Sequence, residues 1–201
     1  MIKGVKYWNN RSRYYSQVNN STEAILRKVG VKKWLETCGS TAAINCLAAM
    51  GHDVTVFCPG QYRPQPEDVL TNYFNDPRNY KKLEDVRRNL DPDKYPGNRV
   101  PQYYPLAVHE VFNVEAEFKF LKDFESVAEL VCEGFAVQLC LVSPGHYIAA
   151  VAYDEDAEEI IFNDPWPNRF PDGNGFNRKL GREEYENNVE PYVIIYRRQM
   201  S

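Results

Sequence analysis

The sequence has few of the residues that organise disulfide-rich or metal-binding proteins. Its 201 residues include five cysteines and three histidines, and no two cysteines form a C-x-x-C pair. Cysteines with this irregular spacing predict neither a disulfide framework nor a zinc site. Asp172, Asn174 and Glu183 approach the spacing of a calcium loop, but Phe176 and Asn177 interrupt its pattern of oxygen ligands and glycine. We therefore expect free thiols, no metal and no cofactor.

The chain also lacks long apolar runs and an excess of positive charge. Its net charge is -4, which gives no reason to expect a nucleic-acid partner. No apolar run approaches the ~18 residues of a membrane span. The start, MIKGVKYWNNRSRYYSQ, has no apolar signal segment, so we expect synthesis in the cytoplasm. Any later release to the cell wall would then need another route, such as a holin.

The remaining composition, 43% hydrophobic and 26% charged, is typical of one globular domain, and we assign residues 1–201 to it. Residues 1–37 form an N-terminal segment with an amphipathic helix near 21–30. Residues 58–105 form an irregular and helical insertion, with short helices near 66–74 and 80–90. Two later helices and five strands are then expected, at 106–114 and 124–134, and at 115–120, 135–142, 146–153, 158–164 and 191–198. Helices first and an antiparallel sheet later indicate an α+β fold.

The stretch ETCGSTAAINCLAAMG predicts a buried helix over residues 38–51. Thr37 is suited to capping its start through the hydroxyl group, and Gly51 to ending it. Cys38 then lies in the first turn, where free amides and the positive end of the helix dipole favour a thiolate. The alternative is an inert buried thiol, which is how we interpret the cysteines in apolar runs, Cys46, Cys132 and Cys140.

Two short strands follow, joined by the polar link YDEDAEE. His146 begins the first strand, and Asp164 ends the second just before a proline, which cannot continue the ladder. A hairpin places the start of one strand beside the end of the other, so the two side chains come within hydrogen-bond reach. Asn163 has the opposite strand parity and is the second choice. Alternatively, His146 is a structural histidine and Asp164 only opens a turn.

A thiol, an imidazole and a carboxylate in these positions are the parts of a cysteine nucleophile with its base and orienting group. The other two histidines do not fit this role as well. His52 follows the end of the helix in a turn, and His109 lies within a predicted helix, so we interpret both as structural or surface residues.

The stretches TCGSTAAINCLAAMG, GHYIAAVAY and IIFNDPWP together resemble the three motifs of the papain-like cysteine peptidases. The most similar branch is the bacteriocin-processing (family thirty-nine) peptidase-like group. The resemblance implies a papain-like α+β fold, in which a helical half with the nucleophile helix packs on an antiparallel sheet. It also implies that Cys38 is the nucleophile, His146 the base and later the acid, and Asp164 the orienting carboxylate.

The sequence departs from that group at one position. Its members carry a glutamine shortly before the cysteine that helps to form the oxyanion hole, whereas the position six before Cys38 is Lys32. The best candidate for the role is Gln17 in YYSQVNN, which resembles a stretch that opens many stand-alone members. A long insertion must then fold away between Gln17 and Cys38.

We therefore expect a cysteine peptidase or amidase that cleaves an amide bond by thiol acyl transfer. The resemblance leaves the substrate open: it could be a peptidoglycan peptide, as for a phage or bacterial lysin, or a leader peptide processed inside the cell. A catalytically inactive peptide-binding module of the same fold is the alternative from another class. The sequence does not indicate an oligomeric state.

Overall fold

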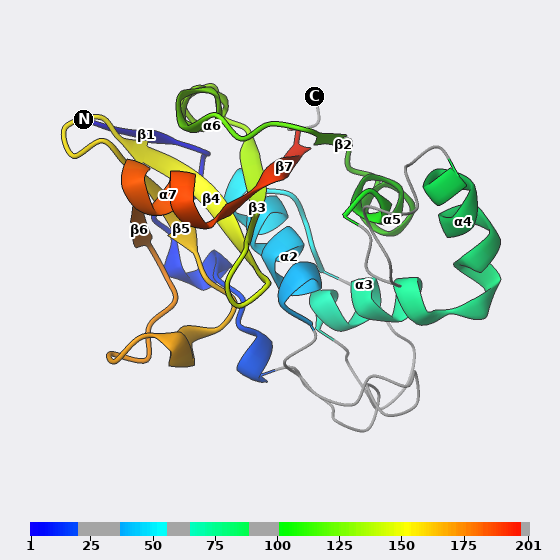
Figure 1. Ribbon diagram of the computed structural model, residues 1–201. Coiled ribbons are helices and arrows are strands. Elements are labelled where there is room, and N and C mark those ends of the chain that lie inside the picture. The colour runs from blue at the N-terminus through cyan, green and yellow to red at the C-terminus, as the bar shows by residue number, and fades with distance from the viewer. Residues whose placement is uncertain (20–36, 56–64, 89–100, 198–201) are drawn as a thin grey trace.

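A seven-stranded antiparallel sheet with helices against both faces forms the centre of the computed structural model, which describes residues 1–19, 37–55, 65–88 and 101–197 (Figure 1). The strand order is β2-β7-β3-β4-β5-β6, and β1 pairs with the far end of β4. The strands are β1 (Ile2–Gly4), β2 (Ala116–Lys119), β3 (Ala136–Leu141), β4 (His146–Asp154), β5 (Glu159–Asn163), β6 (Arg178–Gly181) and β7 (Val189–Tyr196).

The described helices are α2 (Cys38–Met50), α3 (Pro66–Asn75), α4 (Tyr80–Arg88), α5 (Tyr103–Phe112), α6 (Phe124–Cys132) and α7 (Arg182–Asn188). Short 3-10 turns occur at η1 (Arg11–Arg13), η2 (Gln17–Asn19), η4 (Pro77–Asn79) and η5 (Pro167–Arg169). Helix α2 lies against β3 and β4, and α3, α4 and α5 lie to one side of it (Figure 1). This is the predicted α+β architecture, a helical half packed on an antiparallel sheet.

Helix α2 is the central helix of the molecule, and every residue from Gly39 to Met50 is buried. Small and apolar residues on all of its faces make this possible, because no side has to meet water. Gly51 ends the helix in the left-handed conformation, with φ 95°. Thr37 stands at the N-cap as predicted, but its hydroxyl makes no capping hydrogen bond. Its carbonyl instead accepts a bond from the Thr41 hydroxyl at 2.9 Å.

The first turn of α2 is held by both neighbouring layers. The Gln138 side chain of β3 donates a hydrogen bond to the Gly39 carbonyl at 3.1 Å. On the other side, a Cβ atom at Gly39 would lie 2.0 Å from the hydroxyl oxygen of Tyr104 in α5. Only glycine fits there, so the residue after Cys38 sets how closely the helix start approaches α5.

Alternation along the central strands divides the apolar core into two layers. Ala149 and Val151 of β4 pack with α2 on one face of the sheet. Ile148 and Ala150 pack on the other face with α6, through Phe124 and its neighbours. The register between β4 and β5 shifts at a bulge between Ala150 and Ala152. Residues of β4 after the bulge therefore point to the opposite face of the sheet from the one that simple alternation predicts.

The expected helices and strands from residue 66 to 196 are confirmed, with small differences at their ends. Helix α5 begins three residues earlier than predicted, because Pro105 lies in its first turn, where a proline is tolerated. The short elements β1, β6 and α7 were not predicted. The helix expected near 21–30 lies outside the described residues. Across the described ranges, no helix is long and apolar enough to cross a membrane.

Candidate active site

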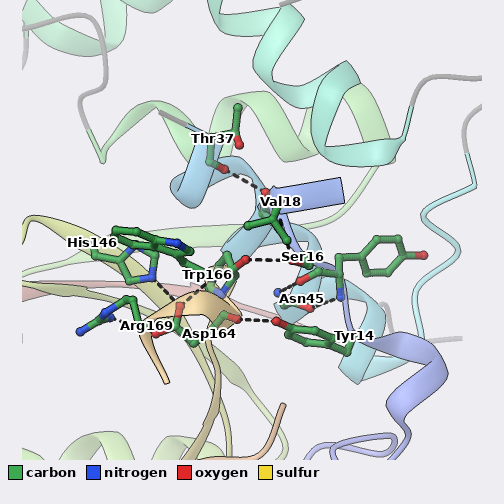
Figure 2. A network of polar contacts seen from close by, with 12 residues as sticks. Tyr14, Ser16, Val18, Thr37, Asn45, His146, Asp164, Trp166 and Arg169 are labelled. Carbon is green, nitrogen blue, oxygen red and sulfur yellow. Dashed lines mark hydrogen bonds and ion pairs between the residues drawn. The ribbon is translucent and has the colours of Figure 1, made fainter. Parts of the chain in front are cut away.

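The side chains of His146 and Asp164 form a short hydrogen bond, with 2.6 Å between Nε2 and Oδ1 (Figure 2). Both residues are buried, at 3% and 0% exposure. Ala149 pairs with Asn163, so one further step in the register would place position 164 opposite Ile148. The two side chains are therefore diagonal neighbours on the hairpin, two residues apart in register, and the imidazole ring spans that distance.

Cys38 completes a line of three side chains, because it lies close enough to His146 to raise the pKa of the imidazole. Nε2 of the imidazole is occupied by Asp164, which leaves Nδ1 as the ring nitrogen available to the sulfur. Cys38 is only partly buried, whereas Cys46 and Cys140 are buried. The structure thus brings together the three residues that the sequence singles out, from the start of α2, the start of β4 and the end of β5.

The surroundings of His146 favour its protonated form. Burial alone lowers the pKa of the imidazole, but the hydrogen bonds to Asp164 and Cys38 outweigh it. The net result is a pKa above the ordinary value of 6.5. An imidazolium beside a thiol stabilises the thiolate, which is the nucleophilic form of cysteine.

Two further donors hold the Asp164 carboxylate in place. The Trp166 amide donates to Oδ1 at 2.8 Å, and the Arg169 guanidinium donates to Oδ2 at 2.9 Å. The Trp166 ring also lies edge-on to the His146 ring, with 6.1 Å between the centroids (Figure 2). Sequence reasoning missed Arg169, since an arginine five residues beyond a strand carries no signal of its partner. The carboxylate is fixed from both of its oxygens.

The main chain of Asp164 is clamped as well. Its amide donates to the Gly175 carbonyl at 2.7 Å, and its carbonyl accepts from the Tyr14 hydroxyl at 2.7 Å (Figure 2). Burial, and to a lesser degree the charge of Asp164, raise the pKa of Tyr14, so that this hydroxyl stays a donor. A Cβ atom at Gly175 would lie 2.2 Å from the Asp164 carbonyl oxygen, which makes glycine necessary at this contact.

Gln17 lies beside the same turn. Its amide donates to the Pro165 carbonyl at 2.8 Å, and its side chain is fully buried. Neither polar atom of that side chain has a hydrogen-bond partner in the part of the chain that the structure describes. Buried side-chain amides are normally paired. An unpaired one is therefore unusual, and it is able to donate a hydrogen bond to an atom of a bound substrate. Its role in an oxyanion hole stays a prediction, and Lys32 lies outside the described residues.

Two hydrogen bonds from a side chain of α2 fix the segment that carries Gln17. The Asn45 side chain accepts from the Tyr15 amide at 2.7 Å and donates to the Tyr15 carbonyl at 2.9 Å (Figure 2). Asn45 is fully buried in the middle of α2. Sequence reasoning missed it, although a lone amide within an apolar helix is a signal that some backbone group needs a partner.

The other candidates lie elsewhere. His52 Nε2 is 3.2 Å from the main-chain carbonyl of Arg197, and His109 lies on α5 beside a glutamate. Asn163 accepts from the Asn177 amide at 3.1 Å and thereby holds the loop after β5. The four described cysteines are free, and the described ranges contain no cluster of side chains able to hold a metal ion.

One comparison with known proteins found a match to a protein family. The model of the Peptidase_C39 like family matches residues 10–195, a range that includes Gln17, Cys38, His146 and Asp164. No curated protein matches the chain.

Proposed function

Because the chain belongs to the Peptidase_C39 like family of papain-like peptidases, we propose that it hydrolyses an amide bond with Cys38 as the nucleophile. Family membership supports a cysteine peptidase in general. The observation that carries the proposal for this chain is the hydrogen-bonded line of Cys38, His146 and Asp164. It contains a nucleophile, a base and an orienting carboxylate in the order that acyl transfer requires.

In the first half of the reaction, the Cys38 thiolate attacks the carbonyl carbon of the scissile amide. The carbonyl oxygen takes the electron pair and becomes an oxyanion, which the Cys38 amide and the Gln17 side chain stabilise. The tetrahedral intermediate then collapses, and the bond between carbon and nitrogen breaks. His146 gives its Nδ1 proton to the departing amine, which leaves a thioester on Cys38.

In the second half, a water molecule attacks the thioester. His146, now neutral, accepts a proton from that water, and the second tetrahedral intermediate releases the carboxylic acid. The sulfur leaves as a thiolate and the imidazolium is restored. Throughout, Asp164 holds Nε2 of the ring, so that Nδ1 always points toward the sulfur.

We propose further that the substrate is the peptide portion of peptidoglycan, so that the protein is a hydrolase of the lysin type. This rests on the resemblance to stand-alone members of the branch. Loss of turbidity of purified cell walls, with new amino groups appearing in solution, is the expected result. Cleavage of leader peptides and not of walls would assign the protein to intracellular processing instead.

The test of Cys38 itself uses alkylation by iodoacetamide at pH 6, read out for each cysteine by mass spectrometry. We expect Cys38 to react at least tenfold faster than Cys46, because the protonated imidazole stabilises its thiolate whereas burial raises the pKa of Cys46 well above the ordinary value. His146→Ala should remove most of this advantage, since the positive partner is lost.

Hydrolysis provides the second measurement. Cys38→Ala should abolish cleavage and leave the fold intact, since one small side chain replaces another in the first turn of α2. Cys132→Ala is the matched control, because that thiol is also partly exposed but lies on α6. Equal alkylation of Cys38 and Cys46, together with cleavage by Cys38→Ala, would favour the inactive peptide-binding module.

A further inference from the structure

A fully buried glutamine lies in the middle of β3, on the face of the sheet that packs against α2. Gln138 is 0% exposed, and its neighbours in the strand, Val137 and Leu139, are apolar and buried as well. A side-chain amide in such a place is costly unless its donor and acceptor atoms find partners. The partners of Gln138 therefore indicate why a polar residue is kept there.

Gln138 uses both ends of its amide to connect β7 with α2. Its Nε2 donates a hydrogen bond to the Gly39 carbonyl at 3.1 Å, and its Oε1 accepts one from the Tyr196 hydroxyl. A carbonyl can only accept, so both bonds form in one orientation of the amide. Burial raises the pKa of Tyr196 well above its ordinary value, so the hydroxyl keeps its proton and remains the donor.

This chain of hydrogen bonds connects the two halves of the candidate active site. Gly39 follows Cys38 in the first turn of α2. Gln138 pairs directly with Ala149 of β4, the strand that begins with His146. One side chain therefore ties the residue next to the sulfur to the strand that carries the imidazole.

Apolar packing alone fixes the first turn of α2 only loosely. The residues that follow Cys38 are glycine, serine, threonine and alanine, whose small side chains interlock little with the sheet. Hydrophobic contact has no preferred direction, whereas a hydrogen bond does. The Thr71 hydroxyl of α3 also donates to Ser40 at 2.9 Å, but α3 carries no residue of the proposed catalytic line.

We propose that Gln138, oriented by Tyr196, is a positioning residue that holds Gly39 so that the Cys38 sulfur stays beside His146. This rests on the proposed function, in which the protonated imidazole stabilises the Cys38 thiolate. The attraction between the two charges weakens as their separation grows. A misplacement of about 1 Å can lower a rate about 10²-fold, so a small shift of the helix start is enough to matter.

The test follows the alkylation of Cys38 by iodoacetamide as a function of pH, because the rate rises with the fraction of thiolate. Gln138→Met keeps the length of the side chain and loses its N–H donor. We expect the midpoint of its pH–rate profile to lie about one pH unit above that of the parent, which is about a tenfold smaller thiolate fraction below the midpoint. At high pH, where the thiol is ionised in both proteins, the two rates should be equal.

Tyr196→Phe is a milder second variant, in case Gln138→Met does not fold. It keeps the donor to Gly39 but removes the hydroxyl that orients the amide. Its midpoint should move in the same direction by a smaller amount. A loss of stability alone would lower the thermal midpoint of a variant without moving its pH–rate profile.

Two control variants remove the same chemical groups elsewhere. Gln102→Met removes a buried amide, and Tyr185→Phe removes the hydroxyl of a buried tyrosine. None of these polar atoms has a hydrogen-bond partner in the described part of the chain. Both controls should have the pH–rate profile of the parent, and the thermal midpoint of each variant checks that it is folded.

Other titrating groups do not account for the expected shift. Burial raises the pKa of Cys140 to about 11 and that of Tyr147 well above its ordinary value, so both stay neutral below pH 9. Glu67 of α3 has a pKa of about 8, but it titrates in every variant alike. A difference between variants therefore reports Cys38 together with His146.

An unchanged profile in both Gln138→Met and Tyr196→Phe would overturn the positioning role, as would an equal shift in either control. The outcome is separable from that of the proposed function. Fast alkylation of Cys38 in the parent, with the same profile in the two variants, would leave the peptidase and remove the role of Gln138. A parent in which Cys38 reacts no faster than Cys46 would remove both.

Discussion

At the scale of single residues, Glu67 is the most unusual group outside the proposed catalytic line. Its side chain is fully buried in the first turn of α3, and its two oxygens have no hydrogen-bond partner on another described residue. Burial is the main cause that raises the pKa of this carboxyl to about 8. The folded protein therefore carries a proton on Glu67 at neutral pH that the unfolded chain releases.

Glu67 should make stability depend on pH. The pKa of Glu67 is higher in the folded state than in the unfolded chain. Its stabilising contribution to the free energy of unfolding is therefore fully present below pH 4.5 and is lost as the pH rises through about 8. At about 1.4 kcal/mol per pKa unit, the loss between pH 5 and pH 8 is about 3 kcal/mol. Glu67→Gln should remove this loss, as measured by urea unfolding at both pH values. Glu84→Gln, at an exposed position of α4, is the control, and an unchanged slope in Glu67→Gln would contradict the assignment.

Gln17 makes a second prediction at this scale. Removal of one oxyanion donor costs about 10²–10³ in turnover, so Gln17→Ala should lower kcat by that factor. The alkylation rate of Cys38 should hardly change, because alkylation forms no oxyanion. Both rates are measured on the same preparation. A variant with kcat within threefold of the parent would show that another donor fills the oxyanion hole.

At the scale of elements, the two hydrogen bonds between Asn45 of α2 and the main chain of Tyr15 should affect kcat. Asn45→Ala leaves the partly buried amide and carbonyl of Tyr15 without their side-chain partner, at a cost of up to about 1–3 kcal/mol each. We expect lower stability and a fall in kcat beyond that of a stability-matched control, because Gln17 loses its position. Thr71→Val is such a control, since it removes a buried hydrogen bond to Ser40 at 2.9 Å that does not involve the segment. Equal kcat values in the two variants would show that Asn45 affects stability but not catalysis.

The elements that carry the proposed catalytic line were predictable because their patterns are local. Helix α2 has an apolar period and a terminal glycine, and the hairpin of β4 and β5 follows from strand spacing around a polar link. The hairpin geometry was sufficient to pair His146 with Asp164. The partners that fix Asp164 were not predictable, because Tyr14 and Gly175 come from distant segments and nothing local marks their contacts.

At the scale of the whole molecule, the site lies on the seam between the helical half and the sheet. Cys38 belongs to α2, whereas His146 belongs to β4, so the fast reaction that we expect of Cys38 needs both halves in place. We propose that they unfold as one cooperative unit. With rising urea, the loss of fast Cys38 alkylation should then share its midpoint with the exposure of Cys46, which is fully buried in α2. Separate midpoints in one mass-spectrometric titration would indicate two units.

The contact between Asp164 and Arg169 has a consequence for the charge of the site during the reaction. In the proposed mechanism His146 alternates between imidazolium and imidazole as it passes its proton, whereas a guanidinium keeps its charge at every step. Asp164 is fully buried, and the Arg169 donor at 2.9 Å remains beside it when the imidazole becomes neutral. The carboxylate therefore never becomes an isolated buried charge, which would be costly. In this way a permanent cation lets the proton on His146 move while the charge behind it stays balanced.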